Sequence, residues 1–143
     1  MRGRGTRIYL GLACIVLAGG CGGLWLDTYW RSERYVLMAV DARGQMNLAF
    51  DCGDGTAMGL VGPTVFSIGA DEKYIVLKQH PSKDAFGAFD RSVTNYFVVE
   101  RTQSPELAER QKGVRGPLSN EEFDKLSVIL RLPQFSKTFD DLK

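Results

Sequence analysis

Cys21 is the residue whose neighbours point most directly to covalent chemistry. It follows small residues in the run Leu17-Ala18-Gly19-Gly20, and an export peptidase needs small residues just before its cleavage point. A cysteine at that point can carry a lipid such as palmitate once the segment before it has been removed. We therefore expect lipidation of Cys21, and we assign no catalytic, cofactor-binding or metal-binding residue.

Other groups that could do chemistry lack the partners that the chemistry needs. Asp51–Gly55 has the oxygen-rich look of a calcium loop, but glycines stand at its third and fifth positions, where an EF-type loop needs ligands. His80 is the only histidine, whereas a zinc site needs three or four donors. Ser67 and Ser82 have no nucleophile-elbow glycines around them. We expect no cofactor and no enzyme activity.

Cys52 is the cysteine left over for the body of the protein. Cys14 lies in the apolar N-terminal segment and Cys21 is the expected lipid site. One remaining cysteine cannot form a disulfide within the chain. We expect a small, buried or half-buried side chain, and pairing with another chain or a reactive thiol remain alternatives.

The segment that positions Cys21 has the layout of an export signal. Arg2, Arg4 and Arg7 precede the uncharged stretch Ile8–Leu26, whose glycines gather around the cysteine. We favour a lipoprotein signal. An uncleaved anchor remains open, because about 20 apolar residues span a bilayer as a helix, and so does plain secretion. In the first two cases the arginines stay in the cytoplasm, and the body faces the periplasm or the exterior of a bacterial cell envelope.

The chain then divides into a signal peptide at residues 1–20 (or an anchor to residue 26), a tether at 21–33, and a single extracytoplasmic domain at 34–143. Within the tether, Asp27–Ser32 is expected to be a short link. The whole chain carries 18 basic and 17 acidic side chains, so removal of the N-terminal arginines leaves a slight acidic excess. Nucleic-acid binding needs a clustered basic face. We expect no nucleic-acid partner, and membrane contact through the lipid or anchor alone.

The first two thirds of the domain have the character of extended chain. The sequence predicts a hairpin from Arg34–Asp41 and Gln45–Phe50, followed by a turn at Asp51–Gly55 and a short apolar run at Val65–Ile68. Lys73–Lys78 is apolar on both sides, which is typical of a central strand covered on both faces.

A further strand and a helix are predicted near the C-terminus. Asn95–Arg101 is the strand, and Thr102–Arg115 has no apolar period and is predicted to be a mobile loop. Ser119 and Glu122 have the spacing of a capping box, after which Phe123, Leu126, Ser127 and Leu130 share one helix face with Ile129 beside them. Pro133 ends the helix. The expected fold class is therefore α+β: a small antiparallel β-meander sheet with a C-terminal amphipathic helix packed on it.

Two stretches of the domain resemble the small bacterial lipoproteins grouped as domain of unknown function 3997. The shared pattern lies in Val65–Gln79, with its Lys-Tyr-Ile-Val-x-Lys-Gln strand, and in Asn95–Leu132, with its aromatic strand and the run Gly-Pro-Leu-Ser before the helix. The connection between Arg101 and Gly116 is longer than the resemblance leads us to expect. The resemblance implies an exported lipoprotein with a β-meander and a terminal helix, and it transfers no catalytic residue.

These observations favour a non-catalytic, membrane-tethered lipoprotein that binds a protein partner through the Thr102–Arg115 loop or a polar strand face. A more specific version is an immunity protein that neutralises a toxin directed to the periplasm. Two alternatives remain. One is a structural or assembly accessory of the envelope, and the other is a small-ligand binder with a pocket around Phe86, Phe89 and Tyr96.

Overall fold

The computed structural model describes residues 26–85, 88–102 and 106–143 of the chain. The predicted signal or anchor segment, Cys21 and Phe86 lie outside the described residues. None of the helices in the described ranges is long and apolar enough to cross a membrane.

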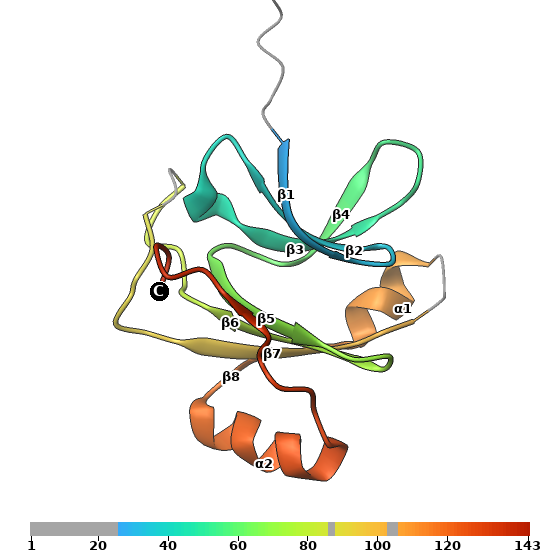
Figure 1. The fold of residues 1–143 in the computed structure, drawn as a ribbon, viewed down its shortest axis with the longest axis vertical. Coiled ribbons are helices and arrows are strands. Elements are labelled where there is room, and N and C mark those ends of the chain that lie inside the picture. Colours follow the sequence, from blue (N-terminus) through green and yellow to red (C-terminus); the bar gives the residue numbers. More distant parts are fainter. Residues whose placement is uncertain (1–25, 86–87, 103–105) are drawn as a thin grey trace, which may run out of the picture.

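Two antiparallel sheets stack face to face (Figure 1). The first has four strands in chain order: β1 (Leu26–Ser32), β2 (Tyr35–Val40), β3 (Asn47–Asp51) and β4 (Ala57–Val61). The second has five strands in the order β8-β7-β6-β5-β9: β5 (Val65–Ala70), β6 (Tyr74–Gln79), β7 (Asn95–Glu100), β8 (Val114–Leu118) and β9 (Lys137–Thr138). The prediction of antiparallel strands with a packed helix is confirmed, and the prediction of a single meander sheet is wrong.

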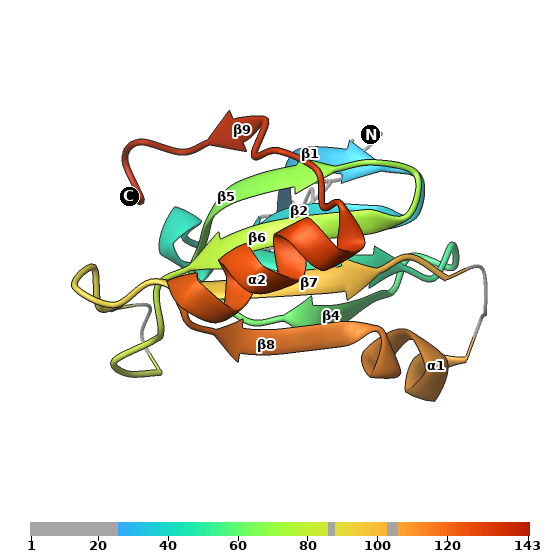
Figure 2. The ribbon, with the colours of Figure 1, turned by 90° about the horizontal axis from the view of Figure 1, so that it is seen from below.

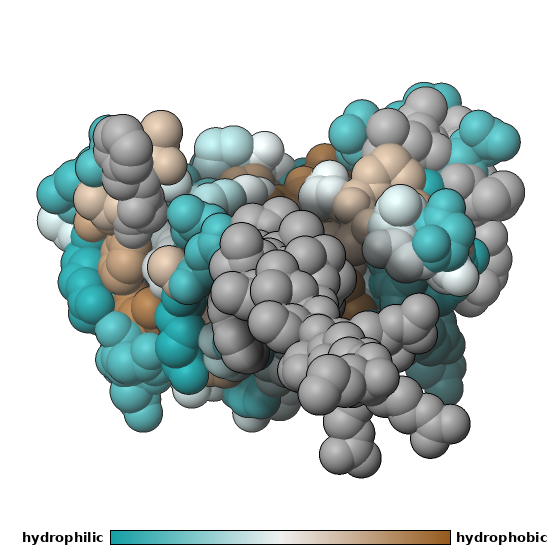
Figure 3. All heavy atoms as spheres, turned by 90° about the horizontal axis from the view of Figure 1, so that it is seen from above, coloured by the Kyte–Doolittle hydropathy of each residue, from teal (hydrophilic) through white to brown (hydrophobic). Residues whose placement is uncertain are grey.

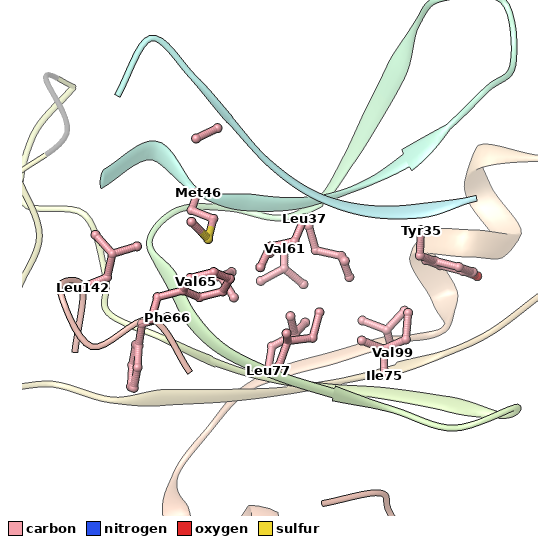
Figure 4. Close-up of a cluster of buried hydrophobic side chains, with 14 of the residues drawn as sticks. Tyr35, Leu37, Met46, Val61, Val65, Phe66, Ile75, Leu77, Val99 and Leu142 are labelled. Carbon is pink, nitrogen blue, oxygen red and sulfur yellow. The ribbon is translucent and has the colours of Figure 1, made fainter. Parts of the chain in front are cut away.

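The main hydrophobic core fills the space between the two sheets (Figure 4). Leu37 and Leu48 enter it from the first sheet, and Ile75 and Leu77 enter it from the second, each fully buried. Burial of one such side chain contributes about 1.5–3 kcal/mol relative to leaving it exposed. Each sheet turns an apolar face toward the other, and the packing of the two sheets removes both of these faces from water.

β6 is a central strand covered on both faces, as its sequence predicts. Ile75 and Leu77 point into the core between the sheets, whereas Tyr74 and Val76 belong to a second apolar cluster on the outer face of the second sheet. The alternation of strand side chains produces this division. The helix α2 (Asn120–Leu130) covers the outer face (Figure 2).

The start of α2 has the predicted capping box. The Ser119 hydroxyl accepts a hydrogen bond from the Glu122 backbone N–H at 3.3 Å, and the Glu122 carboxylate accepts one from the Ser119 N–H at 2.7 Å. Phe123, Leu126 and Leu130 face the second sheet, as predicted from their spacing. The helix is not the last element, because β9 follows it and pairs with β5.

Two segments predicted to be irregular have regular structure. Residues 26–32 of the predicted tether form β1, because Tyr29 and Trp30 pack against the core and the strand pairs with β2. The Thr102–Arg115 loop contains the helix α1 (Leu107–Lys112) and the start of β8. Val114 pairs with Val99 and packs against the core. One apolar residue such as Val114 in a polar stretch does not produce a helical or strand periodicity that could be recognised in the sequence.

The C-terminal residues close one side of the space between the sheets. Phe139 and Leu142 are buried in the core, and Ser67 of β5 bonds the Thr138 hydroxyl at 2.8 Å. Arg91 donates to the carbonyl oxygens of Asp141 and Lys143, at 2.9 and 2.6 Å. The end of the chain is therefore an integral part of the fold.

Candidate functional site

α2 carries two large apolar side chains that point away from the protein. Val128 is 80% exposed and Ile129 is 75% exposed, against 56% for Leu26 and 42% for Val93, the other exposed large hydrophobics of the described residues. At 100° of rotation per residue, Val128 lies on the side of the helix opposite Phe123, Leu126 and Leu130. Neither side chain stabilises the isolated fold through burial, and together they form an unusual feature on a polar helix face.

A groove lies beside Val128, between α2 and the segment that returns from it. Its volume is about 310 Å³. We call it the α2 groove. Its lining consists of four residues from the helix and four from the return segment: Phe123, Asp124, Ser127, Val128, Leu132, Pro133, Gln134 and Phe135.

Aromatic rings pack together beneath the groove. The ring of Phe123 lies 4.8 Å from that of Tyr96 and 5.6 Å from that of Phe135, measured between centroids. The Lys78 ammonium lies 4.6 Å from the Phe135 centroid and 5.5 Å from the Tyr96 centroid. Burial first, and then the negative charge of Asp124, raise the pKa of the Tyr96 hydroxyl above its usual value. The rings beneath the groove thus pack on one another and hold the Lys78 ammonium against them.

The return segment is held at a fixed distance from the helix. Arg131 ends α2 in the left-handed conformation, at φ 54°, and the Leu132 N–H donates to the Ser127 carbonyl at 3.1 Å. The Ser136 N–H donates to the Ile68 carbonyl at 3.0 Å. At Gly69 of β5, a Cβ would overlap the Gln134 carbonyl oxygen and lie 2.8 Å from its carbon. The groove is therefore formed in the folded chain without a bound partner.

Asp124 is the one charged side chain in the lining of the α2 groove, and Glu121 and Glu122 lie on the same helix outside that lining. Glu121 pairs with Lys125 at 2.7 Å, and the hydrogen bonds from Ser119 hold the pKa of Glu122 below its usual value. Asp124 accepts a hydrogen bond from Asn120 at 2.9 Å, and no cation of the described residues forms an ion pair with it. The Ser127 hydroxyl donates to the Asp124 carbonyl at 2.8 Å.

His80 is a buried core residue and does not face the α2 groove. Its ring is stacked between Phe66 and Phe89, with centroids 4.2 and 6.0 Å away, and its Nδ1 lies 2.6 Å from the Val93 carbonyl oxygen. Its buried Nε2 has no hydrogen-bond partner among the described residues. The imidazole fills space between two phenyl rings.

The segment Asp51–Gly55 forms a turn, as predicted, and two of its carboxylates accept hydrogen bonds from backbone N–H groups two residues further along the chain. Asp51 accepts from the Gly53 N–H at 2.9 Å, and Asp54 accepts from the Thr56 N–H at 2.9 Å.

Cys52 is half-buried against the core and is a free thiol. Over the described ranges, no group of three or more histidine, cysteine, aspartate or glutamate side chains is placed to hold a metal ion.

The aromatic pocket proposed for a small ligand is not assembled. Phe89 packs against the core between the sheets, whereas Tyr96 belongs to the cluster under α2, on the other face of the second sheet. Phe86 is outside the described residues. The predicted Thr102–Arg115 binding surface is partly internal, because Arg110 is 3% exposed and its guanidinium lies 4.0 Å from the Phe50 ring centroid.

A second hollow, beside α1, is lined by charged and polar groups. Its volume is about 280 Å³, and Glu100, Arg101 and Lys112 contribute to its walls. The Arg101 guanidinium is occupied by hydrogen bonds within the fold, because it donates to the Asp71 carbonyl and to the Ser32 carbonyl and hydroxyl. A third hollow of about 360 Å³ near Pro63 is likewise without an exposed large apolar side chain. The α2 groove is therefore the candidate site.

Sequence reasoning missed this site because it treated α2 only as a core helix. The helical period gives Val128 no role and predicts Ile129 beside the core face, whereas Ile129 is 75% exposed. The available signal was a pair of adjacent β-branched side chains in a helix whose inner face was already complete with Phe123, Leu126 and Leu130.

Comparison with protein families places most of the domain in one of them. A family model described as a protein of unknown function, DUF3997, matches residues 32–142. The search of curated proteins and the search of solved structures find no match.

Proposed function

The chain belongs to the DUF3997 family, and from its α2 groove we propose that it is a non-catalytic, membrane-tethered envelope protein that binds a partner protein. The observation that carries the proposal is the exposure of two large apolar side chains on α2, Val128 at the edge of the α2 groove and Ile129 next to it on the helix. Large apolar groups at the centre of a polar rim are the usual anchors of protein interfaces.

The position of the N-terminus supports a protein rather than a membrane as the occupant. β1 begins on the side of the molecule opposite α2 (Figure 1). From Cys21 to Leu26 the backbone can reach at most about 18 Å, at 3.3–3.6 Å per residue. A lipid on Cys21 would keep the β1 side close to the bilayer and turn α2 away from it.

The surface opposite α2 carries hydrophilic side chains along its rim and hydrophobic areas between them (Figure 3). This arrangement leaves the exposed valine and isoleucine of α2 facing the periplasm or the exterior.

The test is co-purification from the native host, using the full-length chain in its own membrane. Val128→Asp should remove a stoichiometric partner, because a carboxylate cannot be buried in an apolar contact without a large cost. Val93→Asp, the same substitution at another exposed valine, should retain it. The proposal fails if both variants retain the partner, or if the wild-type chain brings down none.

A toxin as the partner is the more specific form of the proposal. An inhibitor needs only a surface complementary to its target, and in this proposal the α2 groove is that surface. Deletion of the gene should then leave cells unchanged until the toxin is present. A detergent or morphology defect without any toxin would instead make the protein an envelope accessory.

A further inference from the structure

We propose that two copies of this chain pair along the free edge of β4, so that their first sheets join into one continuous antiparallel sheet. This surface lies on a different element from the α2 groove. Its basis is an edge strand that lacks the side chains which guard the other sheet edges, and whose residues fit one another when two copies run antiparallel.

β4 is the last strand of the first sheet and has one free edge. In the ranges that the structure describes, it pairs with β3 alone. The N–H and C=O groups of an edge strand that point away from its neighbour have no strand to bind. Gly59 is exposed, and a Cβ added to it would meet nothing within 4 Å. Because glycine has no side chain, this exposure belongs to the backbone itself, and an added strand is the occupant whose backbone groups match it.

The other edges of the two sheets carry side chains that oppose strand addition. Charged residues and proline on an edge strand discourage pairing with another chain. Such residues are present in all three of these edge strands: Asp27 and Arg31 in β1, Arg115 and Pro117 in β8, and Lys137 in the short β9. β4 has neither a charged residue nor a proline. Its register against β3 shifts once, but the registers of β1 and β8 against their neighbours shift as well, so this irregularity does not set β4 apart.

The sequence of β4 fits a second copy of itself. Full overlap of two antiparallel copies of the strand brings uncharged residues opposite one another throughout: Gly59 with Gly59, Met58 with Leu60, and Ala57 with Val61. Apolar side chains that face each other across two strands stabilise a sheet, and like charges that face each other would destabilise it. A closed pair with two-fold symmetry is the commonest assembly of identical chains.

The symmetry of this pair suits two chains that are tethered to one membrane, and this point rests on the proposed function. A two-fold axis between antiparallel strands is perpendicular to their sheet, so both copies turn the same face of the first sheet in the same direction. β1 begins on the side of the molecule opposite α2 (Figure 1). Both tethers therefore leave the pair on one side, and both α2 helices lie on the other. Confinement to one membrane also raises the effective concentration of the chains.

The test is co-purification of two differently tagged full-length copies expressed in the native membrane. Wild-type copies should co-purify. Gly59→Lys in both copies should lower the co-purified fraction by about threefold or more, because two ammonium groups then face each other across the strands. A Gly59→Lys copy combined with a Gly59→Asp copy should restore it, because opposite charges then meet. Thr28→Lys places the same side chain at an exposed residue of β1, the opposite edge of the sheet, and should leave the fraction unchanged.

The outcomes separate this inference from the proposed function. Pairing through β4 is overturned if wild-type copies do not co-purify, if Gly59→Lys leaves their association unchanged, or if the oppositely charged copies fail to associate. Self-association that Val128→Asp abolishes and Gly59→Lys does not would assign the contact to α2 and also overturn it. A different protein that still co-purifies with a chain that does not self-associate would leave the proposed function standing. Thermal melting of each variant checks that it is folded.

Discussion

The apolar side chains of α2 belong to two classes that differ in their exposure. Phe123 is 7% exposed and packs on Tyr96, whereas Val128 is 80% exposed. Truncation of the first should leave a cavity and lower the free energy of unfolding by about 3–5 kcal/mol. Truncation of the second should change it by about 0.5 kcal/mol or less. Urea unfolding of Phe123→Ala and Val128→Ala measures both, and equal losses would show that Val128 is a core residue.

Glu122 should make the stability of the protein depend on pH. Its hydrogen bonds from Ser119 lower its pKa in the folded chain relative to the unfolded chain. The stabilisation is therefore complete above the ordinary glutamate pKa of about 4.3 and is lost as the pH falls through the folded value. Glu122→Gln keeps a neutral cap and should show a shallower decline in urea midpoint between about pH 5 and pH 3. The pKa is also lowered at three aspartates, Asp51, Asp54 and Asp90. Their contribution to the pH dependence of stability is the same in the wild type and in Glu122→Gln. Identical pH profiles would contradict this role.

The position of α2 as an element depends on a close approach at Gly69. The return segment crosses β5 there, so that a Cβ would overlap the Gln134 carbonyl. Gly69→Ala should displace the segment and lower the free energy of unfolding by about 1–3 kcal/mol. Gly59→Ala on β4 is the matched control, because its Cβ would meet nothing within 4 Å. Thermal melting distinguishes the two, and an unchanged melting temperature for Gly69→Ala would show that the crossing is not constrained.

The elements with a strong local pattern are the ones that could be predicted from the sequence. β6 and β7 are dense runs of β-branched and aromatic residues, and α2 has both a capping box and a 3.6-residue period. β1 mixes polar residues with Tyr29 and Trp30, and β9 has only two residues. Their strand geometry comes from pairing with neighbours, which local sequence does not encode. The groove was missed for a similar reason, since its second wall, Leu132–Phe135, has no regular structure.

At the scale of the whole molecule, the C-terminal segment completes the core between the two sheets. Phe139 is 7% exposed and meets Tyr29 of β1 edge to face, with centroids 6.0 Å apart. Phe139→Ala should lower the free energy of unfolding by about 3–5 kcal/mol. Asp140→Ala changes an exposed neighbour and should be close to neutral. A near-neutral Phe139→Ala in urea unfolding would mean that the sheets pack without the C-terminal segment.

The stacking of the two sheets could not be predicted either, because it depends on contacts between residues far apart in the sequence. Each meander is formed by neighbours in the chain, but the contact of Leu37 and Leu48 with Ile75 and Leu77 joins residues far apart in sequence. The doubly apolar character of β6 correctly predicted two covered faces. It did not reveal that one cover is a second sheet and the other is α2.

Photo-crosslinking in the native host tests the central claim most directly. A photoreactive amino acid at Gln134, in the full-length chain, should give one discrete protein adduct, because Gln134 is exposed and lines the α2 groove. The same amino acid at Thr28, exposed on β1 on the opposite side of the molecule, should not give that adduct. The adduct at Gln134 should disappear when Val128→Asp is added. A partner that crosslinks at Thr28 and not at Gln134 would place the binding surface elsewhere and contradict the account.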